Sequence, residues 1–432
     1  MNFDQALAYL YGLGHETVAM KLGLSNTEKL LAALGRPQDA FRKVQVAGTN
    51  GKGSTCAFLE SMLRVSGARV GLNTSPHLVE VTERIRINGH DISREEFGRI
   101  VGQVYAAVGK LRVEGVQPTF FEHLTALALV AFRVAQCDVG ILETGLGGRL
   151  DSTTAAGAET VAITPIHYDH TKFLGETFAA IAAEKAAIIR PGTPAIIAPQ
   201  PLEAMQVIRA RCAECEVTPI LVEENAEVTG YTPHGRLRVN FTTPQDRYEN
   251  VTLALRGRHQ IVNALTAVYL AETLREQGLK ITRAAILEGL ATARHAGRLD
   301  LREGAPPTLY DGAHNEQGAQ ALRDYLQEFA QQPITLVFGT MRDKKMDKIA
   351  PLLFPLAEKI VLTQPDQPRS ATPKALAAAV PENLRDRVSL IPTVAEAMRQ
   401  ARDLTPSDGL ILVTGSLYLV GEAIGLEPLA NK

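Results

Sequence analysis

The sequence of 432 residues has no tryptophan, few aromatic residues (5%) and no hydrophobic run long enough to cross a membrane. Its longest apolar stretch, residues 124–132, falls far short of the roughly 20 residues that a bilayer requires. The net charge at pH 7 is −2 and no long basic segment occurs, so the charge pattern indicates neither nucleic acid nor a membrane surface as a partner. Residues 1–10 lack the basic and apolar regions of a signal peptide, and we expect a cytoplasmic protein.

Cysteine is also scarce, with 4 residues in the chain. Cys212 and Cys215 are spaced as a Cys-x-x-Cys pair, but no second pair occurs, and a structural zinc site takes four ligands. Cysteine usage at this level is typical of a reducing compartment. We interpret the pair as two free thiols near the end of a helix, with a metal or redox role as the alternative.

What the chain does contain is a regular alternation of short apolar runs with helical patterns, over a length that suggests two or three domains. This alternation predicts an α/β protein with a doubly wound, mostly parallel sheet. Around His234-Gly235 the pattern changes to short polar and apolar alternation, which predicts an antiparallel hairpin appended to the main sheet. The strand-like runs lie at residues 44–47, 70–73, 139–143, 161–165 and 195–198.

A domain boundary is expected near residues 293–298, after helical patterns at 261–277 and 283–291. Beyond it the strand and helix patterns restart, which predicts a second, smaller, Rossmann-like α/β domain. We therefore expect domains at residues 1–294 and 295–432. The strand-like runs of the second domain lie at residues 309–310, 334–338, 360–363, 388–391 and 410–414.

Seven residues, Gly48-Thr49-Asn50-Gly51-Lys52-Gly53-Ser54, stand between the first strand and a helical pattern at 55–65. A glycine-rich turn at a helix N-terminus directs backbone N–H groups and the positive end of the helix dipole at one point, and Lys52 adds a cation, so the segment predicts a polyphosphate site. It differs from G-x-x-x-x-G-K-[ST], because Gly53 follows the lysine where a hydroxyl normally reaches Mg²⁺. A metal-binding hydroxyl is therefore expected from elsewhere. The alternative is a plain glycine-rich turn with a surface lysine.

Polar residues follow other predicted strands, and the carboxyl ends of parallel strands meet at one edge of a sheet. Ser75, Glu143 and His170 occupy such positions, and together with phosphate oxygens they could hold Mg²⁺. The alternatives are a turn residue, a surface charge and a structural histidine. Lys185 lies in an otherwise apolar helical face, and on its own it reads as a lysine whose ammonium reaches solvent.

These motifs, in this order, resemble the folylpolyglutamate synthase and dihydrofolate synthase family, a branch of the Mur-ligase group of ADP-forming amide synthetases. The resemblance runs through nearly the whole chain, and several such motifs in order are highly specific. Ala187, Ala296 and Asp300 depart from the usual residues, but none of them removes a catalytic group. The matching stretches are residues 46–55, 74–89, 120–124, 143–152, 169–175, 183–188, 258–264, 297–298, 311–315 and 414–417.

The resemblance implies ATP and Mg²⁺ as cofactors and assigns roles to residues. Lys185 matches the lysine that carries CO₂ as a carbamate, and Ser75, Glu143 and His170 match the Mg²⁺ ligands. Lys52, Lys185, His170 and His314 form the implied catalytic set. The residues implied to bind ATP are Thr49, Asn50, Gly51, Lys52, Gly53, Ser54, Asn263, Arg298, Asp311 and His314.

A second set of residues matches segments that contact the pterin substrate in this family. Phe120 and Phe121 offer flat apolar faces for a pterin, and Glu122 and Asp151 could accept hydrogen bonds from its amino groups. The full set is Lys21, Leu22, Gly23, Leu24, Thr119, Phe120, Phe121, Glu122, Leu150, Asp151 and Ser152.

The implied reaction is phosphorylation of a substrate carboxylate by ATP, followed by attack of the amino group of glutamate on the acyl phosphate. We expect a monomer that uses dihydropteroate, tetrahydrofolate and L-glutamate, with an enzyme restricted to polyglutamylation as the alternative. A P-loop GTPase would normally carry Asn-Lys-x-Asp, which is absent. A cell-wall ligase of the Mur type would carry a further N-terminal domain. A non-catalytic nucleotide-binding module would not need the predicted metal ligands.

Overall fold

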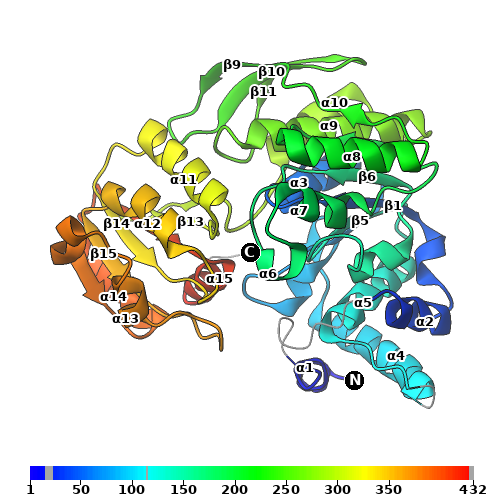
Figure 1. Ribbon diagram of the computed structural model, residues 1–432, viewed down its shortest axis with the longest axis horizontal. Coiled ribbons are helices and arrows are strands. Elements are labelled where there is room, and N and C mark those ends of the chain that lie inside the picture. Colours follow the sequence, from blue (N-terminus) through cyan, green and yellow to red (C-terminus); the bar gives the residue numbers. More distant parts are fainter. Residues whose placement is uncertain (15–22, 113–114, 428–432) are drawn as a thin grey trace.

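The computed structural model describes residues 1–14, 23–112 and 115–427. It contains three sheets, of eight, three and six strands. The eight- and six-stranded sheets form the centres of two α/β bodies that lie side by side (Figure 1). We call residues up to 292 the N-terminal region, residues 293–299 the linker and residues from 300 the C-terminal region.

The eight-stranded sheet confirms the predicted doubly wound, mostly parallel architecture. Six neighbouring strands run parallel, and β3 and β4 add an antiparallel edge that the sequence patterns did not predict. In spatial order the strands are β4 (His90–Asp91), β3 (Ile85–Ile87), β2 (Val70–Asn73), β5 (Val139–Glu143), β1 (Arg42–Ala47), β6 (Thr160–Ile163), β7 (Ala195–Ile197) and β8 (Ile220–Leu221).

Helices cover both faces of this sheet because its central strands are buried on both sides. In β1, Val44 and Val46 pack with α3, α9 and α10 in one core, while Gln45 points the other way and bonds Thr153 and Thr154. The helices of this region are α1 (Phe3–Tyr11), α2 (Ser25–Ala33), α3 (Lys52–Val65), α4 (Arg94–Leu111), α5 (Phe120–Val134), α6 (Thr171–Leu174), α7 (Phe178–Ala186), α8 (Leu202–Glu214), α9 (Gln260–Glu276) and α10 (Arg283–Thr292).

The predicted hairpin exists, but its expected place in the main sheet is wrong. β9 (Ala226–Tyr231) and β10 (Leu237–Thr242) form a separate sheet with a third strand, β11 (Arg247–Thr252). The alternating pattern explains the difference, because Leu237 and Phe241 are buried in the same core as residues of α9. The sheet therefore stabilises itself by packing on a helix and not by pairing with β8 (Figure 1).

The C-terminal region repeats the α/β pattern at smaller size, as predicted. Its sheet is parallel apart from the edge strand β12, and α11 and α12 share one core while α14 and α15 share another. The strands in order are β12 (Asp300–Arg302), β13 (Thr308–Asp311), β17 (Leu410–Thr414), β14 (Ile334–Phe338), β15 (Lys359–Leu362) and β16 (Val388–Leu390), and the helices are α11 (Glu316–Phe329), α12 (Met346–Leu353), α13 (Pro373–Ala377), α14 (Val394–Leu404) and α15 (Leu417–Gly425).

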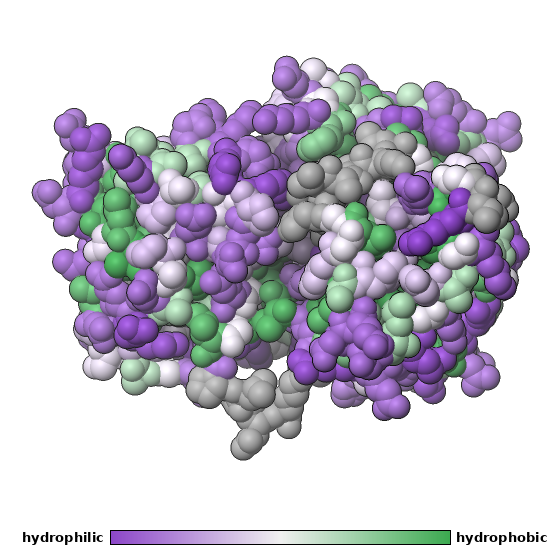
Figure 2. All heavy atoms as spheres, turned by 90° about the horizontal axis from the view of Figure 1, so that it is seen from below, coloured by the Kyte–Doolittle hydropathy of each residue, from purple (hydrophilic) through white to green (hydrophobic). Residues whose placement is uncertain are grey.

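Two features of the composition can be followed in the structure. Within the described ranges, every helix is too short or too polar to serve as a membrane span. Figure 2 shows one face of the molecule, where hydrophilic side chains spread over both regions and hydrophobic ones occur in small groups. Cys212 and Cys215 are both buried and unpaired at the end of α8, which confirms the interpretation as free thiols.

Candidate active site

The glycine-rich segment forms the turn between β1 and α3, and its backbone is fixed by the chain after β6. The backbone N–H groups of Thr49 and Asn50 donate to the carbonyl of Pro165, at 3.1 and 3.3 Å. The hydroxyl of Thr49 donates to the carbonyl of His167 and accepts from its N–H, both at 3.0 Å. The helix begins at Lys52 with Gly51 as its N-cap, three residues earlier than the sequence predicted.

Two glycines of this turn have no room for a side chain. Gly48 and Gly51 have φ angles of 150° and 89°, which favour glycine. A Cβ atom on Gly48 would lie 1.8 Å from the hydroxyl oxygen of Thr164, and one on Gly51 would lie 2.2 Å from Oδ1 of Asn263. The turn is therefore held tightly between β6 and α9, with its remaining backbone facing a cavity.

Two lysines share one carbonyl beside this turn. Lys52 Nζ donates to the carbonyls of Gly48 and Thr49, both at 3.1 Å, and Lys185 Nζ donates to the carbonyl of Gly48 at 2.7 Å. The Lys185 side chain is buried, so it does not reach solvent as a surface lysine would. Burial, followed by repulsion from Lys52, lowers the pKa of Lys185 to about 7.

The structure brings Ser75, Glu143 and His170 to the wall of one cavity. Glu143 is buried at the end of β5, and one of its oxygens accepts from the backbone N–H of Ser75 at 3.2 Å. Burial raises the pKa of Glu143, and the charge of Lys52 opposes that shift. The side chain of His170 is 37% exposed, yet partial loss of hydration within the site lowers its pKa to about 4, so the ring is neutral at pH 7 and retains a free electron pair.

The predicted metal ligands, Ser75, Glu143 and His170, suit an ion that takes most of its ligands from water and from a bound phosphate. In the part of the chain that the structure describes, no three His, Cys, Asp or Glu side chains come together as a metal site. The predicted set supplies one carboxylate, one imidazole and one hydroxyl. That fits Mg²⁺, which keeps several waters and is commonly held by one or two protein ligands together with substrate phosphates.

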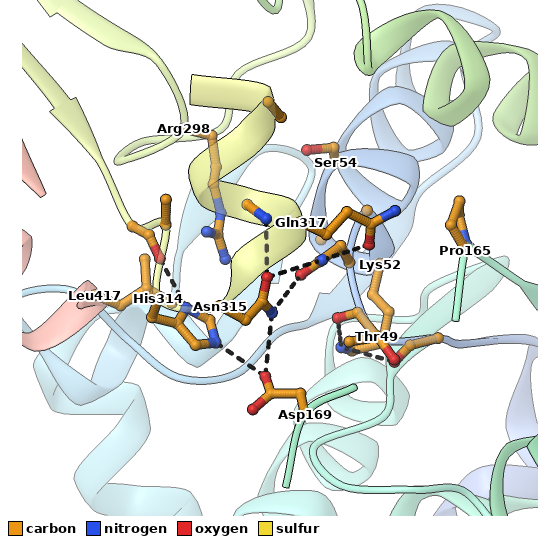
Figure 3. Close-up of a pocket in the computed structure, with 18 of the residues that line it drawn as sticks. Thr49, Lys52, Ser54, Pro165, Asp169, Arg298, His314, Asn315, Gln317 and Leu417 are labelled. Carbon is orange, nitrogen blue, oxygen red and sulfur yellow. Dashed lines mark hydrogen bonds and ion pairs between the residues drawn. The ribbon is translucent and has the colours of Figure 1, made fainter. Parts of the chain in front are cut away.

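The C-terminal region meets this site at Asp169, which lies just after β6 (Figure 3). His314 Nε2 lies 3.2 Å from Asp169 Oδ2, Asn315 Nδ2 donates to the same oxygen at 3.3 Å, and Lys344 Nζ donates to Oδ1 at 2.7 Å. Burial alone would raise the pKa of Asp169, but the hydrogen bond from His314 and the charges of His314 and Lys344 outweigh it. They hold that pKa well below its usual range.

A second contact between the regions joins the glycine-rich turn to the start of α11. Asn50 and Asn315 exchange hydrogen bonds through their side-chain amides at 3.1 and 3.2 Å, and Asn50 also donates to Gln317 Oε1 at 2.7 Å (Figure 3). Asn315 is the N-cap of α11 and accepts from the N–H of Gly318. The amide pair therefore places the N-terminus of α11 directly against the turn.

All residues predicted to bind ATP or metal line this first cavity, whose volume is about 230 Å³. Asp311 is buried, and its oxygens accept from the N–H groups of Leu299 and Ala313, both at 2.9 Å, so it fixes the linker to the turn after β13. The predicted residues found there are Thr49, Asn50, Gly51, Lys52, Gly53, Ser54, Ser75, Glu143, His170, Lys185, Asn263, Arg298, Asp311 and His314.

Most of the residues predicted to bind a pterin line a second cavity of about 210 Å³. Leu24 lies instead at the N-cap of α2 and does not line it, and Lys21 and Leu22 lie outside the described residues. The C-terminal region also contributes to the lining of this cavity, with Lys344 and Arg369 among its residues. The predicted residues found there are Gly23, Thr119, Phe120, Phe121, Glu122, Leu150, Asp151 and Ser152.

Several of these side chains are already engaged within the protein. Phe120 stacks with Tyr11 at a centroid distance of 6.0 Å, and the guanidinium of Arg84 lies 5.7 Å from the same ring. Asp151 Oδ2 accepts from the N–H groups of Gly145 and Leu146, both at 2.9 Å. The ring of Phe121 lies against Gly145, but this side chain is only half-buried, whereas Phe120 is buried. Phe121 therefore offers a ligand more aromatic surface than Phe120.

Glu122 is engaged in the same way as Asp151. It accepts from the N–H of Thr119 at 2.6 Å and from the hydroxyl of Thr27 at 3.3 Å. Hydrogen bonds from either carboxylate to substrate amino groups stay a prediction.

The two cavities share a wall. Ser75, His170 and His314 line both of them, so a group reaching through the second cavity meets the contents of the first at these side chains. The sequence patterns missed Asp169 as an interdomain contact and also missed Asn315, Gln317 and Lys344. Asp169 adjoins the predicted ligand His170, and Asn315 follows His314 in the matched Asp-Gly-Ala-His-Asn stretch, so these two carried a signal. Gln317 and Lys344 carried none.

Known proteins share this fold and much of this sequence. Residues 46–271 match the Mur ligase middle domain, and residues 297–417 match the Mur ligase, glutamate ligase domain. The chain is 37% identical to the dihydrofolate synthase/folylpolyglutamate synthase of Bacillus subtilis (strain 168), over 97% of this chain and 98% of that protein.

Two solved structures are similar over almost their whole length. The structure of Escherichia coli FolC in complex with DHPP and ADP has a TM-score of 0.86 at 30% identity, covering 98% of this chain and 97% of that one. A bifunctional folylpolyglutamate synthase/dihydrofolate synthase from Yersinia pestis, complexed with AMPPNP and Mn ion, has a TM-score of 0.85 at 28% identity, covering 98% and 97%.

Proposed function

This chain belongs to the Mur ligase family, in its dihydrofolate synthase/folylpolyglutamate synthase group, and from that premise we propose which of its residues carry out each part of the reaction. The chain is an ADP-forming amide ligase that adds L-glutamate to dihydropteroate and to tetrahydrofolates, with ATP and a divalent metal as cofactors. The observation that carries the residue roles is the shared wall of Ser75, His170 and His314 between the two cavities.

The first cavity holds ATP. The backbone N–H groups of residues 51–54, at the N-terminus of α3, face the phosphates, and Lys52 releases the loop carbonyls to bind the γ-phosphate. Ser75, Glu143 and His170 would hold Mg²⁺, which supplies positive charge to the transferring phosphoryl group. Arg298 and Asn263 contact the nucleotide from opposite sides of the cavity.

The second cavity holds the pterin-bearing substrate with its carboxylate directed at the shared wall. A carboxylate oxygen of the substrate attacks the γ-phosphorus of ATP, and the bond between that phosphorus and the β,γ-bridging oxygen breaks. ADP departs, and the substrate becomes an acyl phosphate. Lys52 and Arg298 neutralise the developing charge, and catalysis is mainly a matter of positioning and electrostatics.

Glutamate then attacks the acyl carbon through its amino group, and phosphate leaves with the bonding electrons. His314 lies beside the shared wall, with Nδ1 near the carbonyl of Gly312 at 2.8 Å and Nε2 near Asp169. We assign His314 to stabilising the attack of the glutamate amino group on the acyl phosphate. Contacts from both regions close the cavities, and closure keeps water from the acyl phosphate.

We further propose domains at residues 1–294 and 295–432, a monomer, and a cytoplasmic location. The domain limits are supported by the two matched family domains, 46–271 and 297–417, which end and begin on either side of residue 294. The location is supported by four buried, unpaired cysteines, as expected for a reducing compartment.

The test is ADP release by the purified chain with dihydropteroate and with tetrahydrofolate, each with and without glutamate, followed by mass analysis of the products. Release that depends on glutamate with both substrates is the expected result. Products from tetrahydrofolate alone would favour an enzyme restricted to polyglutamylation. ADP release that does not respond to glutamate would overturn the assignment as a ligase.

A further inference from the structure

Gly53 occupies the position at which a common P-loop places a hydroxyl that reaches Mg²⁺. The structure shows what fills the space of the missing side chain. A Cβ atom on Gly53 would lie 2.7 Å from Cε1 and 2.9 Å from Nε2 of His295, and 3.4 Å from Oε1 of Glu143. The imidazole ring therefore lies over Gly53, on the side of the turn that faces the proposed metal ligand Glu143.

The orientation of this ring is fixed by a hydrogen bond on its other nitrogen. His295 Nδ1 lies 3.2 Å from the hydroxyl oxygen of Ser54, which also accepts from Gln260 Nε2 at 3.3 Å. With Nδ1 directed at Ser54, Nε2 lies beside Gly53, 2.9 Å from the position of an added Cβ atom, and Oε1 of Glu143 lies 3.4 Å from that same position. Metal-binding histidines and their outer partners are commonly oriented in this way, by a hydrogen bond from the nitrogen that faces away from the metal.

Water has access to the same point. A third cavity, of about 1630 Å³, meets the first at a wall that includes Gly53, Ser75, Glu143, His295 and Arg298. A Mg²⁺ ion with few protein ligands keeps several of its waters. Each metal-bound water directs its hydrogens outward, so it needs a hydrogen-bond acceptor beyond the metal.

We propose that His295 is that acceptor: Nδ1–H donates to Ser54, and Nε2 accepts a hydrogen bond from a water on the metal held by Glu143, in place of the hydroxyl that Gly53 lacks. The inference rests on the proposed metal site. His295 is thus a positioning residue that acts through the bound water. It lies in the linker, so it also ties the metal site to the connection between the two regions.

The test measures Mn²⁺ binding directly, by electron paramagnetic resonance of the full chain with a non-hydrolysable ATP analogue. His295→Asn keeps a group near Nδ1 and loses the one near Nε2, whereas His295→Gln reaches the Nε2 position. We expect H295N to weaken Mn²⁺ binding by about tenfold or more, as loss of an outer-shell partner commonly does, and H295Q to stay within about threefold of wild type. His90→Gln, on the exposed edge strand β4, is the matched control.

A swap of the two positions separates this role from a merely structural one. Gly53→Ser alone should weaken Mn²⁺ binding, because its Cβ would collide with the imidazole. The double variant Gly53→Ser/His295→Ala should bind Mn²⁺ more tightly than His295→Ala, because the ring is gone and a hydroxyl faces the metal.

Glu143→Gln distinguishes failure of the inference from failure of the metal site. If E143Q loses Mn²⁺ while H295N and the double variant bind it as wild type does, the role of His295 is overturned and the metal site stands. If E143Q also binds Mn²⁺ unchanged, the metal site and the inference are both wrong.

Discussion

At the scale of single residues, the charge of Lys52 is the feature on which turnover depends most directly. Its ammonium is partly buried and, among the described residues, bonds to carbonyls of its own turn alone, so the side chain adds little to core packing. We expect Lys52→Ala to lower kcat/KM by more than about a hundredfold, as loss of a preorganised charge does at transition states, with unchanged circular dichroism. Lys110→Ala, exposed in the last turn of α4, is the control. Activity of K52A within tenfold of wild type would contradict the phosphate role.

For Lys185 the prediction is a chemical modification, carbamylation by CO₂. The ammonium groups of Lys185 and Lys52 both donate to the carbonyl of Gly48 and repel each other. Only a neutral amine adds CO₂, and it loses a proton as the carbamate forms. With its pKa lowered to about 7 by burial and by Lys52, the reactive fraction of Lys185 rises as the pH passes through 7, whereas an unperturbed lysine requires a pH near 10. The carbamate replaces one of the two cations with an anion.

Carbon-13 NMR of the protein at constant dissolved labelled CO₂ tests this directly. We expect one carbamate signal that appears between pH 6 and 8, a range set by that lowered pKa, and that is missing from Lys185→Ala. An active wild-type protein without the signal would refute carbamylation.

At the scale of elements, the turn between β1 and α3 is constrained by its glycines. Gly51 has a φ of 89° and lies against Asn263, so Gly51→Ala adds strain of about 1–3 kcal/mol at positive φ in addition to the collision. We expect weaker binding of an ATP analogue by calorimetry and a lower unfolding temperature. Gly109→Ala is the matched control, because that glycine lies in α4 with no atom within 4 Å of an added Cβ, and alanine there should stabilise by at most about 1 kcal/mol. Equal nucleotide affinity in the two variants would contradict the assignment.

The central strands of the two large sheets were predictable because each is a short, mostly apolar run buried on both faces. The ligand-bearing loops followed from the ends of those strands. Other elements were not predictable in this way. β4 and β12 are short edge strands, and β3 is a short strand next to the edge; all three have little apolar pattern. In β11 the two buried residues, Tyr248 and Val251, are three positions apart and so break the alternation of a half-buried strand. A search for alternating apolar residues therefore does not detect this strand.

At the scale of the whole molecule, the sequence predicted that both regions contribute to one site but not which side chains join them. His314 and Lys344 reach Asp169 from 145 and 175 residues away, and no local pattern specifies such pairs. The same holds for His295, because its position over Gly53 exists only in the folded protein and no local pattern indicates it. Local periodicity predicts elements and their ends, whereas partners across a domain interface depend on how two finished domains dock.

That docking depends unequally on the ion pairs that cross it. In one pair, Lys344 Nζ lies 2.7 Å from Asp169 Oδ1 and each side chain is 11% exposed. In the other pair, the side chains of Arg258 and Glu328 are 54% and 29% exposed. Removing one member of a buried pair leaves the other as an unpaired buried charge and lowers stability by about 3–5 kcal/mol. An exposed pair contributes about 0–1 kcal/mol to stability. Because the pKa of Asp169 is held well below its usual range, its charge persists throughout pH 5 to 8, and the pair is lost only in stronger acid, as the pH falls through that lowered value.

We therefore expect Asp169→Asn to oppose closure of the two regions over ATP and the pterin substrate, with Glu328→Gln as the matched control. Small-angle X-ray scattering with a non-hydrolysable ATP analogue and tetrahydrofolate should give a smaller radius of gyration than the free protein for wild type and E328Q, and little change for D169N. Steady-state kinetics should show a higher KM for ATP in D169N, because closure must then proceed against an unpaired Lys344. If D169N contracts as fully as E328Q, the buried pair does not hold the regions together and closure depends on the ligands alone.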